Sequence, residues 1–248
     1  MTRRALRAQA RADARVARGW SVVGIVGELL VTAGLLLMLF VAWQLWWTDV
    51  EAGRTVDHEV TTLRHSFDVG QAPDPKAPDG LIEGETFALL HIPRLGADWV
   101  YPIKQGTDLS ILSGGLGHYV ETAPPGEVGN FAVAGHRTTW GRPFHDIETM
   151  VEGDRIVVET GATWEVYAVT SHEIVSPYAV EVIAPVPDQP GEAPTKAMLT
   201  LTTCHPKFSA EQRYIVHAEL LETRTREEGL PASVLAPPSA AFATTGAL

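Results

Sequence analysis

Three side chains of types used in nucleophilic catalysis stand next to strand-like segments, and Cys204 is the first of them. It follows the strand-like run 199–203 and is the only cysteine among the 248 residues. Because Pro206 stops strand pairing soon afterwards, Cys204 is expected at the rim of a sheet, where a thiol can meet a substrate. Taken alone, a free cysteine is more often a small buried hydrophobe, so the interpretation depends on partner residues.

His136 is the candidate acid and base for this thiol. It follows the strand-like run 130–134 and Gly135. An imidazole that leaves a strand beside a glycine can approach a thiol and exchange a proton with it. Spacing along the sequence does not eliminate three other histidines, which are His118, His145 and His205.

Arg213 is the third candidate. It lies nine residues after Cys204, at the start of the next strand-like run. If the two strands are antiparallel neighbours, this spacing places the arginine beside the cysteine. A guanidinium there can bind the anionic tetrahedral intermediate of an acyl transfer or the backbone carbonyls of a substrate.

The composition limits the classes of protein that these residues can serve. With 45% hydrophobic and 20% charged residues, the chain is too apolar to be disordered and long enough for one sizeable domain with accessory segments. A single cysteine excludes an internal disulfide framework and any multi-cysteine zinc or iron–sulfur site. The formal net charge of −11 disfavours nonspecific electrostatic binding to nucleic acid.

The sequence pattern of residues 86–222 is typical of an all-β domain. Their short β-rich runs are separated by turns containing proline and glycine, and residues 160–163 are typical of a hairpin turn. Such a series predicts a β-barrel or sandwich with few short helices, one of them near residues 144–150. Barrel closure suits a small domain because it removes exposed strand edges. The runs are 87–92, 99–103, 131–134, 155–158, 164–169, 197–202 and 214–220.

The N-terminal 47 residues predict a membrane anchor. Residues 1–19 form a basic arm with six arginines and one acid, and residues 20–47 form a mainly apolar segment that contains Glu28 and has three tryptophans near its end. This segment is longer than the core of a cleaved signal peptide and suffices to span a bilayer, which takes roughly 20 residues. Because arginine-rich flanks stay in the cytoplasm, we predict a single-pass plasma-membrane protein with a cytoplasmic N-terminus and an extracytoplasmic domain.

Two further segments flank the β-rich domain. Residues 48–85 are expected to form a stalk and linker, because apolar residues spaced 4-3-4 from Val56 to Phe67 mark a narrow helical stripe and the proline-rich stretch 73–80 then ends any helix. Residues 223–248 are expected to be a disordered tail, since their alanine- and proline-rich end has little apolar surface to bury.

The candidate residues lie in motifs that resemble one family. Thr200-Leu-Thr-Thr-Cys204 followed by Arg213 is similar to the TLxTC…R signature of sortases. Residues 134–140, Ala-Gly-His-Arg-Thr-Thr-Trp, resemble the histidine motif of the class E branch found in actinobacteria. The approach to that motif, residues 117–130, and the apolar anchor are similar to the same branch. The resemblance covers roughly residues 20–222.

This resemblance implies a closed eight-stranded sortase-like β-barrel with the activity of a membrane-anchored cysteine transpeptidase. The Cys204 thiolate would attack the Thr–Gly bond of a C-terminal sorting signal and form a thioester, which a cell-wall amine would resolve. His136 would protonate the leaving glycine amine and later deprotonate the incoming nucleophile, while Arg213 would steady the substrate and oxyanion. The candidate substrate-binding residues are Thr203, Tyr119, His118 and Tyr101.

The resemblance also indicates the partners. The expected substrates are secreted proteins with an LAxTG- or LPxTG-type sorting signal, with LAxTG preferred, and the expected amine belongs to a lipid II-like peptidoglycan precursor. No cofactor or metal is expected. His172-Glu173 lacks the second histidine of a zinc-protease helix, and the sequence has no EF-hand loop or glycine-rich phosphate loop.

Three alternatives compete with this interpretation. An L,D-transpeptidase is also a β-rich wall enzyme with a catalytic cysteine, but its S-H-G-C-x-R order does not match Thr203-Cys204-His205. An anchored non-catalytic binding module with a buried Cys204 is the second alternative, which thiol labelling would distinguish. A hydrolase on the same fold is the third, and only product analysis with an amine acceptor separates it from a transpeptidase.

Overall fold

The computed structural model describes residues 3–77 and 80–237. The chain forms two compact units, Met1–Thr48 and Asp49–Leu248. The helix α1, Arg3–Asp68, is 66 residues long and contributes to both. Among the described residues, the first unit consists of this helix alone.

The apolar part of α1 in the first unit fits the dimensions of a bilayer. Its window Gly24–Val41 has a mean hydropathy of 2.3 over 18 residues, and none of the window is buried. At 1.5 Å per residue, such a window covers about 27 Å, close to the ~30 Å of a hydrocarbon core. The described residues therefore contain one helix long and apolar enough to cross a membrane, inside the predicted anchor at residues 20–47.

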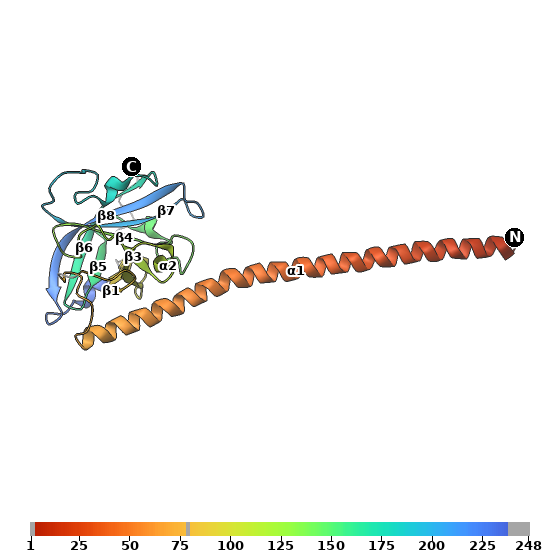
Figure 1. Cartoon of the computed structure of the whole chain (residues 1–248), viewed down its shortest axis with the longest axis horizontal. Coiled ribbons are helices and arrows are strands. Elements are labelled where there is room, and N and C mark those ends of the chain that lie inside the picture. The colour runs from red at the N-terminus through yellow and green to blue at the C-terminus, as the bar shows by residue number, and fades with distance from the viewer. Residues whose placement is uncertain (1–2, 78–79, 238–248) are drawn as a thin grey trace. The chain divides into compact units, whose positions relative to one another are not determined.

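The second unit is built on a closed β-barrel of eight strands in the order β1-β2-β3-β4-β7-β8-β6-β5 (Figure 1). This order confirms the predicted eight-stranded barrel and excludes a sandwich. Closure pairs every strand on both sides, so no sheet edge is left to recruit another chain. The strands are β1 (Thr86–His91), β2 (Val100–Gln105), β3 (Leu116–His118), β4 (Gly129–Ala134), β5 (Arg155–Glu159), β6 (Thr163–Val175), β7 (Ala197–His205) and β8 (Gln212–Thr225).

The sequence does not predict β3, although this strand completes the barrel. It pairs in parallel with β2 and antiparallel with β4. Three residues around Gly117 are too few to display the alternation that marks a strand. Glycine is needed there because a Cβ at Gly117 would collide with the carbonyl oxygen of Gly106. Tertiary packing, rather than local propensity, therefore creates this strand.

Four short helical turns lie between strands, and a fifth follows the last strand. The helix expected near residues 144–150 is a single 3₁₀ turn, η2, and the hairpin expected at 160–163 joins β5 to β6, with the Thr160 N–H donating to the Thr163 carbonyl over 2.9 Å. The helical turns are η1 (Pro93–Leu95), α2 (Leu109–Leu112), η2 (Ile147–Thr149), η3 (Val180–Ile183) and α3 (Ala232–Leu235).

Packing inside the barrel sets which way β7 faces. Leu199 and Leu201 point inward and pack in one core with Phe131 of β4 and Val216 of β8, all at most 1% exposed. Each such side chain stabilises the fold by about 1.5–3 kcal/mol. Because successive side chains of a strand alternate between faces, Cys204 points to the opposite face. The core therefore dictates the orientation of the thiol.

The part of α1 that belongs to the second unit packs on the barrel wall. Four of its side chains are buried in one cluster with Leu89 of β1. Glu59 reinforces the contact by accepting hydrogen bonds from Lys104 at 2.8 Å and from Thr86 at 2.7 Å. The segment 48–85, expected to be a stalk and linker, thus begins as a helix seated on the barrel. The four buried side chains are Val56, Val60, Leu63 and Phe67.

The C-terminal strand is longer than expected. β8 pairs with β6 as far as Thr225, past the expected end of the barrel at residue 222. The helix α3 follows within the segment expected to be a disordered tail. Residues 238–248 of that segment lie outside the described residues.

Candidate active site

Cys204 and Arg213 lie opposite each other on adjacent strands. β7 and β8 are antiparallel, and their register pairs Cys204 directly with Arg213. The nine-residue spacing is therefore bridged by one connection, residues 206–211, between the strands. Residues paired in this way have Cβ atoms about 4.5–5.5 Å apart. The thiol and the root of the arginine side chain share one face of the barrel rim.

His136 reaches the same level from the other side of β7. β4 runs parallel to β7, and just beyond it the Gly135 N–H donates to the Thr202 carbonyl over 3.1 Å. The register ends with Ala134 opposite Thr202, and extending it by two residues would bring His136 level with Cys204. The buried Thr203 hydroxyl supports the alignment with a 2.7 Å hydrogen bond to the Gly135 carbonyl. Cys204, Arg213 and the segment that carries His136 thus lie at the same end of β4, β7 and β8.

Close packing requires the glycine before His136. A Cβ at Gly135 would lie 2.6 Å from two ring atoms of Phe144 and 2.7 Å from a methyl group of Leu116. Phe144 is fully buried, and its N–H donates to the His136 carbonyl over 3.1 Å. The aromatic ring therefore packs on the backbone that carries the imidazole and fixes where that imidazole leaves the strand.

The imidazole of His136 is half-buried and has an unused polar atom. Its Nε2 is buried without a hydrogen-bond partner among the described residues. Burial lowers the pKa of His136, because the imidazolium form loses hydration. A neutral ring is therefore favoured at neutral pH. A buried nitrogen without a partner is uncommon in native proteins, so this atom is a candidate for proton transfer.

A groove begins beside Arg213, with a volume of about 160 Å³. Its polar wall contains Arg213, Tyr119 and Thr202, and the Tyr119 hydroxyl lies 3.0 Å from the Thr202 hydroxyl. Val175, Ile215 and residues of η3 supply its apolar wall. Thr202 lies two residues before the cysteine on the same strand face, which separates the two by about 7 Å. The groove therefore leads toward the thiol.

The guanidinium of Arg213 is held by the connection between β7 and β8. Its Nη1 donates to the carbonyls of Ala210 and Gln212, both over 3.0 Å. These two bonds use a single nitrogen of the guanidinium. The N–H groups of Nε and Nη2 have no partner of this kind among the described residues, so they can serve an anionic or carbonyl oxygen.

The predicted substrate-binding residues fall into two groups. Tyr119 lines the groove, as predicted for a substrate contact. Thr203 instead faces the opposite side of β7 from Cys204, where its hydroxyl bonds the Gly135 carbonyl. The Tyr101 hydroxyl donates to the Gly141 carbonyl over 2.9 Å. Neither Thr203 nor Tyr101 lines the groove beside Arg213.

His118 also lies apart from the thiol. It is 4% exposed and has partners for both ring nitrogens, Nδ1 with Gln105 at 2.7 Å and Nε2 with Thr122 at 3.0 Å. Its ring packs against Phe87 and Phe131 in the barrel interior. Burial lowers its pKa to about 4. These contacts are typical of a core histidine, and His118 does not line the groove beside Arg213.

The other two alternative histidines are less well placed than His136. The Nδ1 of His145 lies 3.2 Å from the Arg137 carbonyl. His205 follows Cys204 on the same strand and so faces the other side, with its ring centroid 5.7 Å from that of Tyr214. Geometry therefore favours His136 as the partner of the thiol.

Arg137 supports the site in a way that the sequence analysis missed. It is 3% exposed and donates to the His145 carbonyl at 3.0 Å, to Glu148 at 2.6 Å and to the Cys204 carbonyl at 3.5 Å. It therefore ties the backbone of the histidine segment to that of the cysteine. The motif Gly-His-Arg was the available signal, but sequence alone does not indicate which way the arginine points. Thr202 was missed for the same reason.

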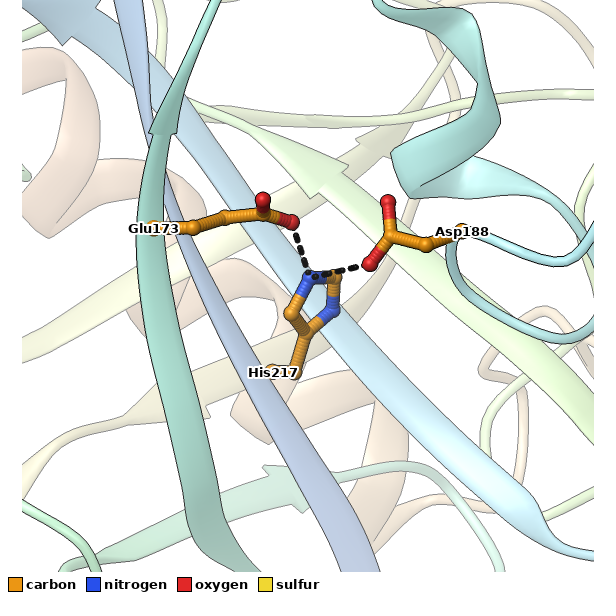
Figure 2. Close-up of side chains that lie close together, drawn as sticks. All are labelled: Glu173, Asp188 and His217. Carbon is orange, nitrogen blue, oxygen red and sulfur yellow. Dashed lines mark hydrogen bonds and ion pairs between the residues drawn. The ribbon is translucent and has the colours of Figure 1, made fainter.

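A separate group of side chains has the donors of a metal site. Glu173, Asp188 and His217 each offer one ligand atom, and these atoms lie within 4.8 Å of one another (Figure 2). They come from β6, β8 and the connection between β6 and β7. The sequence analysis expected no metal because it sought helical and loop motifs, which this arrangement does not use.

Comparisons with known proteins agree on one family. The sortase domain matches residues 90–221. Sortase SrtE1 of Streptomyces coelicolor is 39% identical over 236 residues, which cover 91% of this chain and 65% of that protein. Sortase SrtE2 of the same organism is 37% identical over 212 residues, covering 81% of this chain and 83% of that protein.

A solved structure agrees with these relatives. The crystal structure of Sortase E1 from Streptomyces coelicolor with a tripeptide in the active site is 44% identical to this chain, with a TM-score of 0.56. The match covers 60% of this chain and 95% of that one. By contrast, this chain spans just under two thirds of the length of the SrtE1 sequence.

Proposed function

Because the chain belongs to the sortase family and is class E-like, we propose that it is a membrane-anchored cysteine transpeptidase. It cleaves an LAxTG- or LPxTG-type sorting signal between threonine and glycine and transfers the protein to a cell-wall amine. The register at the barrel rim carries this proposal, since it pairs Cys204 with Arg213 and brings His136 level with the thiol.

The first half-reaction forms a thioester. His136 takes the proton of the Cys204 thiol as the sulfur attacks the carbonyl carbon of the threonine, and the carbonyl electrons move onto oxygen. The anionic tetrahedral intermediate collapses, the C–N bond to glycine breaks, and His136 gives the proton to the leaving amine. The lowered pKa of His136 supports this sequence, because a neutral ring is free to accept the proton.

The second half-reaction transfers the acyl group. A cell-wall amine attacks the thioester carbon, and His136 takes the proton that the amine loses. The C–S bond then breaks, a C–N bond remains, and the proton returns to the Cys204 sulfur. The enzyme is thereby restored without an oxidant, a reductant or a cofactor.

Arg213 stabilises the negative charge of both tetrahedral intermediates. Its position opposite Cys204 and the free donors on Nε and Nη2 support this role. The bonds from Nη1 to Ala210 and Gln212 hold the guanidinium in place before the substrate arrives. Such preorganisation matters because the donors need not reorient as charge develops.

The groove beside Arg213 binds the residues of the signal that precede the scissile bond. Its wall of Val175, Val182 and Ile215 suits the leucine and alanine side chains of an LAxTG signal. Tyr119 and Thr202 offer hydroxyl groups to the peptide backbone. The tripeptide in the active site of Sortase E1 supports a peptide ligand for the corresponding surface here.

The apolar helix anchors the enzyme in the plasma membrane. Gly24–Val41 crosses the bilayer, and the six arginines of residues 1–19 keep the N-terminus in the cytoplasm. The barrel then lies outside the cytoplasm, where secreted substrates and lipid-linked wall precursors meet.

The test uses the full chain in detergent micelles or nanodiscs. It is incubated with LAxTG and LPxTG peptides, with and without an amine acceptor, and the products are identified by mass spectrometry. The matched control is Cys204→Ala, which removes only the thiol. An acceptor-linked product ending at threonine, absent in the control, is the expected result, with LAxTG turned over faster.

Two results would contradict the proposal. Only a free threonine-ended acid, whatever amine is supplied, would identify a hydrolase on this fold. No cleavage of either peptide together with a Cys204 thiol that labels slowly would identify an anchored binding module.

A further inference from the structure

The group Glu173, Asp188 and His217 lies on a different part of the barrel from the three rim residues. Nε2 of His217 is 3.1 Å from Oε1 of Glu173 and 3.9 Å from Oδ2 of Asp188 (Figure 2). The side chain of His217 is 6% exposed, whereas those of Glu173 and Asp188 are 35% and 49% exposed. A buried imidazole therefore points outward to two carboxylates that are open to solvent.

A buried hydrogen-bond chain determines which nitrogen of His217 faces the carboxylates. The Asn130 amide donates to the carbonyls of Val182 at 3.3 Å and Ala184 at 3.0 Å, so its oxygen is left to accept from the Thr200 hydroxyl at 2.8 Å. That hydroxyl has one hydrogen, so it in turn accepts from Nδ1–H of His217 at 2.9 Å. In the neutral ring, Nε2 then carries a lone pair.

When Glu173 and Asp188 are both ionised, this lone pair faces oxygen atoms that can only accept hydrogen bonds. A proton on Nε2 would satisfy Glu173 but not Asp188, which lies farther from the nitrogen. It would also leave two carboxylates beside one positive charge. A single divalent cation among the three atoms would satisfy all of them.

We propose that Glu173, Asp188 and His217 form a binding site for a divalent transition-metal cation of the zinc type. Zinc binds imidazole nitrogen and carboxylate oxygen at about 2.0–2.2 Å, and tetrahedral angles then separate the ligand atoms by about 3.3–3.5 Å. The distances of 3.1 and 3.9 Å bracket that range. An imidazole ligand favours such a metal over calcium or magnesium, which prefer oxygen alone.

The surroundings of His217 match those of metal-binding histidines. Such a histidine donates its second N–H to a fixed acceptor, which holds the ring and sets its tautomer. Thr200 has that role here, and Asn130 fixes Thr200. A pocket of about 280 Å³ lined by Asp188 and His217 gives the ion a path from solvent. Lys196, also at this pocket, is paired with Glu219 at 2.7 Å and so does not neutralise the carboxylates.

The cation would fasten the connection between β6 and β7 to the barrel. Asp188 lies on that connection, while Glu173 and His217 lie on the adjacent strands β6 and β8. The same connection carries η3, whose Val182 and Ile183 line the groove beside Arg213. Metal binding would therefore hold one wall of the groove. The proposed site concerns cation binding and does not rest on the transpeptidase activity.

The experiment measures Zn²⁺ binding to the full chain in detergent by calorimetry, after treatment with a chelator. All samples carry Cys204→Ala, so that the thiol at the rim cannot supply a competing site. Asp188→Asn and Glu173→Gln each remove one ligand charge from a partly exposed position and should leave the fold intact. Glu181→Gln makes the same change at an exposed residue of the same connection and is the matched control.

We expect one Zn²⁺ per chain, bound at least tenfold more weakly by Asp188→Asn and by Glu173→Gln and within twofold of the parent by Glu181→Gln. Co²⁺ should give visible absorption bands that are lost in the same two variants. Circular dichroism of the metal-free variants checks that they are folded. The proposal would be overturned if Zn²⁺ did not bind, or if neither Asp188→Asn nor Glu173→Gln weakened its binding. His217 and Glu173 would then be joined by a hydrogen bond alone.

Discussion

The Thr203 hydroxyl donates a 2.7 Å hydrogen bond to the Gly135 carbonyl, and both groups are buried. This bond joins the residue before the candidate nucleophile to the residue before the candidate base. Thr203 and Gly135 are 68 positions apart in sequence. The relative placement of Cys204 and His136 therefore depends on a contact that neither of them makes.

Replacing Thr203 by valine tests this dependence. Thr203→Val keeps the shape of the side chain but leaves the Gly135 carbonyl without its donor, which should lower the free energy of unfolding by about 1–3 kcal/mol. Turnover number should fall roughly tenfold while KM for the peptide changes little, because the groove is untouched. Urea unfolding and peptide kinetics measure the two effects. Thr223→Val, at an exposed position of β8, should change neither.

Arg213 is expected to act in the transition state. Arg213→Ala should lower kcat/KM by about 100- to 1,000-fold, the effect of removing one oxyanion donor. Arg213→Lys should restore little, because an ammonium has all its donors on one nitrogen, whereas the guanidinium bonds the Ala210 and Gln212 carbonyls through Nη1 and keeps Nε and Nη2 for the oxyanion. Peptide turnover measures both variants. Arg155→Ala, at an exposed position of β5, is the control, and an equal loss there would argue against a specific role.

Alanine should have opposite effects at two glycines, because Gly135 is closely packed and Gly53 is not. Gly135→Ala should destabilise the barrel by about 1–3 kcal/mol, because the new Cβ would lie 2.6 Å from the buried Phe144 ring. Gly53→Ala should stabilise the chain by up to about 1 kcal/mol, since Gly53 lies in α1 with no atom within 4 Å of its Cβ position. Urea midpoints of the full chain measure both. Equal shifts of the urea midpoint in the two variants would show that the Phe144 ring moves aside without loss of stability.

The lowered pKa of His118 predicts that the barrel loses stability in mild acid. Burial lowers its pKa from about 6.5 to about 4, so below pH 6.5 the unfolded chain binds a proton that the folded chain does not. The contribution of His118 to the free energy of unfolding is therefore fully present above pH 6.5. It declines as the pH falls toward 4, and the total loss is roughly 3 kcal/mol. Unfolding experiments at pH 7, 5.5 and 4 measure the slope.

His118→Gln should flatten this dependence, because glutamine does not titrate. His65→Gln, at an exposed position in the last turn of α1, should leave the slope unchanged. If the wild-type slope persisted in His118→Gln, another group would be responsible for the acid sensitivity.

Local features of the sequence determined much of this protein. Alternation of Leu199 and Leu201 with polar residues decided that Cys204 faces away from the core, because strand side chains repeat with a period of two. The eight residues between Cys204 and Arg213 suffice for one antiparallel connection, and the hairpin at 160–163 follows from its turn residues. The apolar helix needed only length and composition. All these features are encoded by neighbours in the chain.

The tertiary structure alone decided which distant segments meet. The parallel pairing of β4 with β7 brings the segment that precedes His136 beside the segment that precedes Cys204, and the Thr203 hydroxyl bonds the Gly135 carbonyl instead of facing the groove. Strand pairing between remote segments depends on barrel closure and core packing, which no local pattern encodes.

The convergence of Glu173, Asp188 and His217 has the same origin. Each residue is unremarkable in its own segment, and none stands at a spacing that marks a metal motif. The register of β6 against β8 and the path of the connection after β6 bring their ligand atoms within 4.8 Å. Sequence determined the strands and the chemistry of the side chains. Closure of the barrel determined which of them act together.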